Sequence, residues 1–145
     1  MNGSFSIWLM LHRCARDPML RLACFRGVAP QEAAILLANI DTVFAQVGQS
    51  IWAGADVGQE LILVVQGGLT SLGHQPRSFQ PGMIAGALPM LDPTRRPYVV
   101  RATEPSRLGL LSHTQLHALL TASPALQRVL GAAVIDDLRR SNRRS

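Results

Sequence analysis

The sequence lacks lysine altogether and is poor in charged, aromatic and cysteine residues. Charged residues make up 16% of the 145 residues and aromatic residues 5%, whereas hydrophobic residues make up 48%. A chain this apolar and this weakly charged is not intrinsically disordered, and its length suits one domain with a core of its own. We attach no functional meaning to the absence of lysine.

The two cysteines, Cys14 and Cys24, lie ten residues apart. They have neither a CxxC spacing nor a nearby histidine pair, so the sequence supports neither a disulfide framework nor a zinc site. We therefore expect two free, buried thiols in a reducing compartment, and no bound metal.

Long apolar runs are absent as well. The run at residues 5–11 has no positive charge before it and ends at His12 and Arg13, far short of the roughly 20 residues that a membrane helix needs. We expect a cytoplasmic protein without a signal peptide or a membrane span.

Arginine accounts for the net charge of +5, and it is concentrated at the C-terminal end. Four of the fourteen arginines fall in the last seven residues: Arg139, Arg140, Arg143 and Arg144. One interpretation is a solvated helix end, where cations interact favourably with the helix dipole. The other is a tail that binds polyanions.

Helix signals stand at both ends of the chain. Starts are indicated at Asp17 and Ala29, each followed by proline, and an apolar stripe runs from the second start as far as Val43. Near the other end, Ser112 is typical of an N-cap for a helix over 113–121, and Ser123 opens a longer helix that ends near residue 141.

Short strands are predicted between these helices. Five segments are rich in β-formers and bounded by turn residues, namely 47–52, 61–65, 69–72, 98–102 and 107–111. Prolines at 76, 81, 89, 93 and 97 limit any helix in that stretch to a turn or two. Helices, then short strands, then two helices indicate an α+β fold, and we expect Trp52, Met83 and Met90 in its core.

Four segments carry a resemblance to a known family. Residues 25–32 are similar to a helical lead-in, Phe-x-Gly-Leu-Ser-x-Glu-Glu. Residues 48–58 are similar to a Gly-x-x-Ile-x-x-x-Gly-Asp-x-Gly turn, and residues 61–67 to a strand that ends in glycine. Residues 81–91 resemble the cassette Pro-Gly-Asp-x-Phe-Gly-Glu-Leu-Ala-Leu-Leu. Over roughly residues 25–138 the chain resembles the cyclic-nucleotide-binding domain family, of the catabolite-activator and protein-kinase-A regulatory type.

The resemblance implies an eight-stranded antiparallel β-roll, or double-stranded jelly roll, with N-terminal helices, a short cassette helix and two C-terminal helices. It divides the chain into a helical extension (1–24), the roll domain with its C-terminal helices (25–141) and a basic tail (142–145). The turn residues that it implies are Gly48, Asp56, Gly58, Gly67 and Gly82.

The resemblance also implies a phosphate-binding cassette. Its ligand-facing positions are Gly86, Ala87, Leu88, Arg95, Arg96, Pro97 and Tyr98. In the family, backbone N–H groups and one arginine bind the cyclic phosphate, and a glutamate after the second glycine binds the ribose. Arg96 stands at the arginine position, or Arg95 after a slip of one residue; a surface arginine in an Arg-rich loop is the alternative.

Several cassette groups are lost at the same time. Ala87 replaces the glutamate, which leaves a ribose hydroxyl unpaired at a cost of about 1–3 kcal/mol. Pro97 and Pro89 carry no N–H, and Tyr98 replaces a smaller residue that it crowds if it points inward. We therefore expect cyclic AMP and cyclic GMP to bind weakly or not at all; a cyclic nucleotide or another small anion is the candidate ligand.

Three classes of function follow. A non-catalytic regulatory module that acts through an altered ligand or through protein contacts is favoured. A working sensor of cyclic AMP, cyclic GMP or a cyclic dinucleotide is the alternative. A transcription regulator that acts with a separate DNA-binding partner is the third, because the sequence ends at Ser145, where family transcription factors continue into a helix-turn-helix. We expect no specific nucleic-acid binding and no catalysis, since no catalytic signature is present.

The last predicted helix carries an apolar stripe. Its members are Leu126, Val129, Leu130, Ala133, Val134 and Leu138. Either the stripe packs onto the roll as a lid, or it forms a seam to a second copy or a partner protein.

Overall fold

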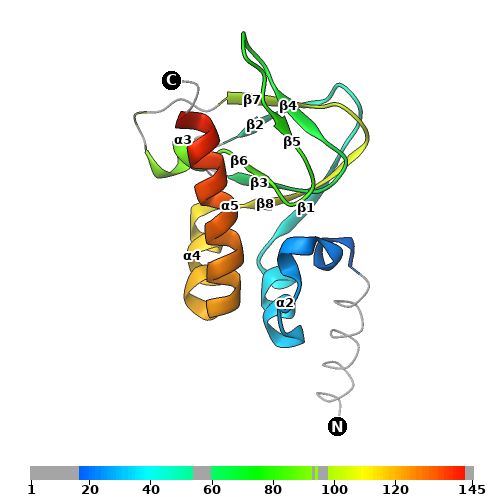
Figure 1. Cartoon of the computed structure of the whole chain (residues 1–145). Helices are drawn as coiled ribbons and strands as arrows, with labels where there is room; N and C mark the ends of the chain where they lie inside the picture. Colours follow the sequence, from blue (N-terminus) through cyan, green and yellow to red (C-terminus); the bar gives the residue numbers. More distant parts are fainter. Residues whose placement is uncertain (1–16, 54–59, 93, 95–97, 143–145) are drawn as a thin grey trace.

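The computed structural model describes residues 17–53, 60–92, 94 and 98–142. Within these residues, eight strands form two four-stranded antiparallel sheets, ordered β1-β8-β3-β6 and β2-β7-β4-β5 (Figure 1). The strands are β1 (Asp41–Ala45), β2 (Ser50–Ala53), β3 (Leu61–Gln66), β4 (Leu69–Ser71), β5 (Ser78–Phe79), β6 (Ile84–Ala85), β7 (Tyr98–Ala102) and β8 (Ser106–Leu111). The predicted β-roll is confirmed.

Helices cover one side of the first sheet, as Figure 1 shows. They are the short 3-10 helices η1 (Pro18–Arg21) and η2 (Ala23–Phe25), then α2 (Pro30–Ala38), α4 (His113–Ala122) and α5 (Pro124–Asn142). The five-residue helix α3 (Ala87–Leu91) stands between β6 and β7. Its length agrees with the limit that the prolines set.

Strand β3 lies in the middle of the core, because its two faces enter different apolar clusters. Leu61, Leu63 and Val65 point to the cluster shared with the helices. Ile62 and Val64 point to the cluster between the two sheets. A strand covered on both faces reads as a continuous apolar run, which explains the sequence of β3.

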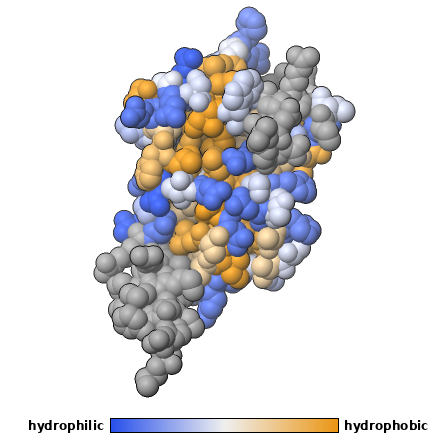
Figure 2. All heavy atoms as spheres, turned by 180° about the vertical axis from the view of Figure 1, so that it is seen from behind, coloured by the Kyte–Doolittle hydropathy of each residue, from blue (hydrophilic) through white to orange (hydrophobic). Residues whose placement is uncertain are grey.

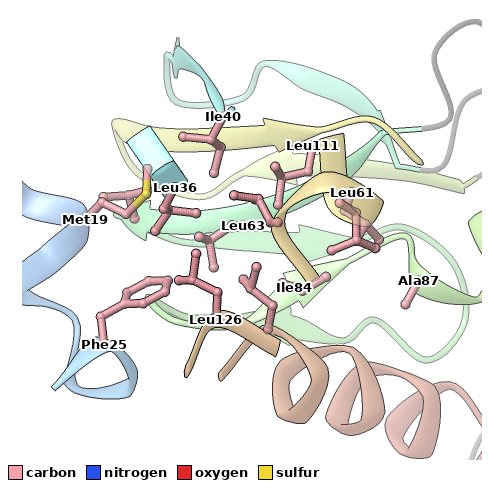
Figure 3. Packing of buried hydrophobic residues seen from close by; sticks show 14 of the residues in the cluster. Met19, Phe25, Leu36, Ile40, Leu61, Leu63, Ile84, Ala87, Leu111 and Leu126 are labelled. Carbon is pink, nitrogen blue, oxygen red and sulfur yellow. The ribbon is translucent and has the colours of Figure 1, made fainter. Parts of the chain in front are cut away.

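The C-terminal helices begin where their capping residues place them. The Ser112 side chain accepts from the Gln115 N–H at 3.1 Å, while the Gln115 side chain accepts from the Ser112 N–H at 2.8 Å, which completes a capping box. Ser123 caps α5 by accepting from the Leu126 N–H at 3.1 Å, and its hydroxyl also bonds to Glu32 of α2. In Figure 3, Leu126 lies among Phe25, Ile84 and the side chains of the first sheet.

The described part of the predicted N-terminal extension packs into the same core. Met19 is fully buried there together with Leu36. Asp17 caps η1 by accepting from the Met19 N–H, and its carboxylate pairs with Arg107 of β8 at 3.3 Å.

Some local expectations are wrong. The apolar stripe that was expected to continue a helix to Val43 ends with α2 at Ala38, and residues 41–45 instead pair with β8. Trp52 is 59% exposed rather than in the core, because it points outward from the edge strand β2. Cys24 is exposed rather than buried, and Cys14 lies outside the described residues.

Candidate ligand cassette

Gly86 is the central residue of the cassette and joins β6 to α3. Its φ is +94°, a left-handed conformation that residues with a Cβ rarely adopt. The N–H groups of Gly86 and Ala87 lie at this turn, at the start of α3. Pro89 is the third residue of the helix, where an N–H has no acceptor within the helix, so its missing donor is tolerated.

Both cassette amides already have acceptors within the chain. The Ala87 N–H donates to Oδ2 of Asp137 at 3.0 Å, and the Gly86 N–H donates to the Tyr98 hydroxyl oxygen at 2.8 Å. Asp137 comes from the C-terminal half of α5, and Tyr98 is the first residue of β7. A carboxylate from a distant helix therefore lies where the cassette offers its donors.

Arg77 completes this cluster. It directly precedes β5 and is 60 residues from Asp137 in the sequence. Its guanidinium donates to Oδ1 of Asp137 at 3.1 Å and to the Tyr98 hydroxyl oxygen at 3.2 Å. It also lies over the rings of Phe79 and Tyr98, at 5.0 and 5.6 Å from their centroids. The side chains of Arg77 and Asp137 are only 7% and 1% exposed. They are thus a buried ion pair with further hydrogen bonds on both partners.

The surroundings shift the pKa values of the acidic members of the cluster. Burial raises the pKa of the Asp137 carboxyl above its ordinary value, and the Ala87 N–H and the Arg77 charge offset part of that rise. Burial, followed by the Asp137 charge, raises the pKa of Tyr98 to about 12. Tyr98 is therefore a neutral phenol at neutral pH.

Arg140 attaches the end of α5 to the same region. Its guanidinium donates to the Ser78 carbonyl oxygen at 2.5 Å and lies over the Phe79 ring at 5.3 Å from the centroid. A second guanidinium N–H approaches the Met83 sulfur at 3.7 Å. Asp137 and Arg140 therefore contact the roll from the same side of α5.

A separate open groove of about 490 Å³ lies away from this cluster, between the end of β1 and the start of β8. Phe44 and Val47 line it and are 73% and 62% exposed. On the back of the molecule, too, apolar surface gathers in patches between polar side chains (Figure 2). The cassette is the candidate site, because polar side chains from β7 and α5 converge there on two backbone amides.

No family model matches the chain. It is 30% identical over 125 residues to the cyclic AMP receptor protein of Thermus thermophilus, a match that covers 81% of this chain and 58% of the relative. The crystal structure of the Thermus thermophilus catabolite activator protein superposes with a TM-score of 0.61 at 27% identity, covering 87% of this chain and 60% of the other.

The chain has the fold of the cyclic-nucleotide-binding domain family. A cyclic nucleotide-binding domain from Methylobacillus flagellatus shares this fold with a TM-score of 0.63 at 19% identity, covering 88% of this chain and 75% of the other. The chain spans 58% of the length of the cyclic AMP receptor protein that it matches.

The predicted family positions fall partly inside the described residues. Gly86, Ala87 and Leu88 form the start of α3, as the resemblance implies, and Ala87 is fully buried. Tyr98 does point inward, with its hydroxyl on the cassette amide. Arg95, Arg96 and Pro97 lie outside the described residues, as do the turn residues Asp56 and Gly58.

The described turn glycines have positive φ, at Gly48, Gly67 and Gly82. Gly67 is the most restricted, because a Cβ there would lie 2.6 Å from the Pro105 carbonyl oxygen. The family strand that ends in glycine is therefore followed by a turn in which no larger residue fits.

Sequence reasoning missed Arg77 and Asp137, although both left a signal. Asp137 lies on the same helical face as Leu126, Leu130 and Ala133. Arg77 and Phe79 are buried on either side of the exposed Ser78, which is the alternating pattern of a strand, so Arg77 takes an inward position. An acid on an apolar helical stripe and a base at an inward strand position each call for a buried partner.

The apolar stripe of α5 packs against the chain's own roll. Leu126 and Leu130 are buried, and the other four members, Val129, Ala133, Val134 and Leu138, contact the helix-side core cluster while partly buried. Ile135, which is 49% exposed, lies on the other side of the helix. The lid interpretation therefore describes these six residues in this structure, and a dimer or partner seam on α5 stays a prediction. None of the described helices has the length and apolarity of a membrane span.

Proposed function

We propose that this domain is a non-catalytic regulatory module of the cyclic-nucleotide-binding type, whose cassette is occupied by the chain's own polar groups. Cyclic AMP and cyclic GMP then bind weakly or not at all. The module acts through an altered ligand or through contacts with a partner protein.

The observation that carries this proposal is the hydrogen bond from the Ala87 N–H to Asp137. Backbone amides at such a turn bind a phosphate only when no other acceptor holds them. Here a carboxylate on one amide and a phenol oxygen on the other take that place. The methyl group of Ala87, at the position of the family's ribose-binding glutamate, removes a further ligand contact.

A working nucleotide sensor is the second candidate, because the relatives named above include a cyclic AMP receptor protein. In that case the nucleotide displaces Asp137 and Tyr98 from the two cassette amides, and its own contacts outweigh the free energy of the hydrogen bonds that are lost. A transcription regulator acting with a separate DNA-binding partner is a third candidate, which rests on the same relative.

Isothermal titration calorimetry on the wild-type chain with cyclic AMP and cyclic GMP separates the first two candidates. We expect no heat of binding for either nucleotide at low-micromolar ligand concentration. Low-micromolar binding of one of them, lost in the Arg96→Ala variant, overturns the proposal in favour of the sensor.

A further inference from the structure

The end of α5 and the cassette share one set of charged contacts. Asp137 joins α5 to the cassette amide of Ala87 and to Arg77, and Arg77 in turn joins Tyr98, whose hydroxyl oxygen holds the Gly86 amide. The Ala87 amide thus contacts α5 directly, and the Gly86 amide is three contacts from it. If another acceptor binds the amides, the contacts that hold the C-terminal half of α5 therefore change.

The Asp137 carboxylate matches an anion in its bonding. Both of its oxygens accept, one from a backbone amide and one from a guanidinium. An amide together with a planar guanidinium is the donor set that also recognises phosphate and carboxylate ligands. The carboxylate and an anionic ligand therefore cannot both hold these donors.

We propose that Asp137 and Arg77 form a displaceable latch, in which the Asp137 carboxylate substitutes for the anionic group of a ligand and holds the end of α5 against the cassette. A ligand carrying a phosphate or carboxylate takes the Ala87 N–H and the Arg77 guanidinium from Asp137, and the C-terminal half of α5 is released. The inference rests on the proposed function, since it assigns the regulation of the same cassette.

The first half of α5 stays in place when the latch opens. Leu126 and Leu130 are fully buried in the helix-side core cluster. Ser123 also ties the start of the helix to Glu32 of α2. Release is therefore confined to the part of α5 that carries Asp137 and Arg140.

Asp136 provides a matched control for Asp137, because it is the adjacent residue, has the same charge and is exposed. Hydrogen exchange measured by mass spectrometry compares Asp137→Asn with Asp136→Asn. We expect Asp137→Asn to speed exchange at least about tenfold in both α3 and residues 134–142, with residues 124–131 unchanged, and Asp136→Asn to change neither.

A second variant covers the case in which Asp137→Asn does not fold. Tyr98→Phe removes only the hydroxyl that joins Gly86 to Arg77. It is expected to speed exchange in α3 and in residues 134–142 together, though less than Asp137→Asn does. Faster exchange in α3 alone, or in neither segment, overturns the latch.

Competition is tested with cyclic AMP as the probe. Asp137→Asn is expected to bind cyclic AMP at least tenfold more tightly than Asp136→Asn, because the internal competitor has lost its charge. Equal binding by the two variants, including no binding by either, overturns the competition. Tight binding by the wild type contradicts the proposed function without touching the coupling of the two segments, so the two failures are distinguishable.

Discussion

The two halves of α5 are attached to the roll in different ways. The first half buries Leu126 and Leu130 completely in the helix-side core. The second half keeps Val134 and Leu138 partly buried and adds two charged attachments, Asp137 and Arg140. Apolar burial is non-directional and does not depend on the contents of the cassette, whereas a charged contact can be exchanged for another ion. One helix thus combines an apolar attachment in its first half with charged attachments in its second half.

The largest effect is expected from Arg77→Met, which leaves the buried Asp137 carboxylate without its cation. Breaking a buried ion pair from one side costs about 3–5 kcal/mol of the free energy of unfolding. Urea unfolding followed by circular dichroism measures the loss.

The double variant Arg77→Met with Asp137→Leu is the control for that prediction. Replacement of a whole buried pair by apolar side chains is often nearly neutral, so the double variant is expected to recover much of the lost stability. If the double variant is no more stable than Arg77→Met, the two side chains are not coupled as described.

Leu126→Ala tests the apolar half of α5. It removes a fully buried side chain and is expected to lower the free energy of unfolding by about 2–4 kcal/mol. Ile135→Ala on the exposed side is the control and should change stability by no more than about 0.5 kcal/mol. Equal losses in thermal unfolding would mean that α5 is not packed in the orientation described.

The roll and the helix starts could be predicted from the sequence, whereas the charged cluster that holds the second half of α5 could not. Glycine spacing and the capping residues Ser112 and Ser123 are local signals, so the roll and the starts of α4 and α5 follow from them. The cluster of Arg77, Asp137 and Tyr98 depends on contacts between residues far apart in the chain. Periodicity places Asp137 on the inward face of α5, but only the packing of α5 over α3 shows which donors it meets.

The titration of Tyr98 reports on the charged half directly, because it is the only tyrosine in the chain. Its phenolate absorbance should appear with a pKa of about 12 in the folded protein, against about 10 after unfolding. A pKa raised in the folded state contributes stability that is complete below the unfolded pKa and is lost as the pH rises through the folded pKa. Stability should therefore fall between these two pH values.

Asp137→Asn should lower the pKa of Tyr98, since the Asp137 charge helps to raise it. The neighbouring exposed carboxylate serves as the reference through Asp136→Asn, which should leave the titration unchanged. A Tyr98 pKa near 10 in the folded wild type would mean that the phenol is solvated rather than placed in the cassette.

The smallest effect is expected from Arg140→Gln. It removes the guanidinium from the Phe79 ring and from the Ser78 carbonyl oxygen, and should cost about 0.5–1 kcal/mol. Arg139→Gln makes the same change at an exposed neighbour with the same helix-dipole interaction. Thermal unfolding that shows equal losses for the two variants would remove Arg140 from the attachment.

The occupied cassette is tested most directly by amide exchange at Gly86 and Ala87 in the wild-type protein without ligand, measured residue by residue by NMR. Neither amide has an acceptor within α3, so its protection reports on Tyr98 and Asp137. Both amides should exchange at least about a hundredfold more slowly than those of the exposed turn residues Gly73 and His74. Exchange at Gly86 and Ala87 as fast as in that turn would contradict a cassette closed by the chain's own side chains.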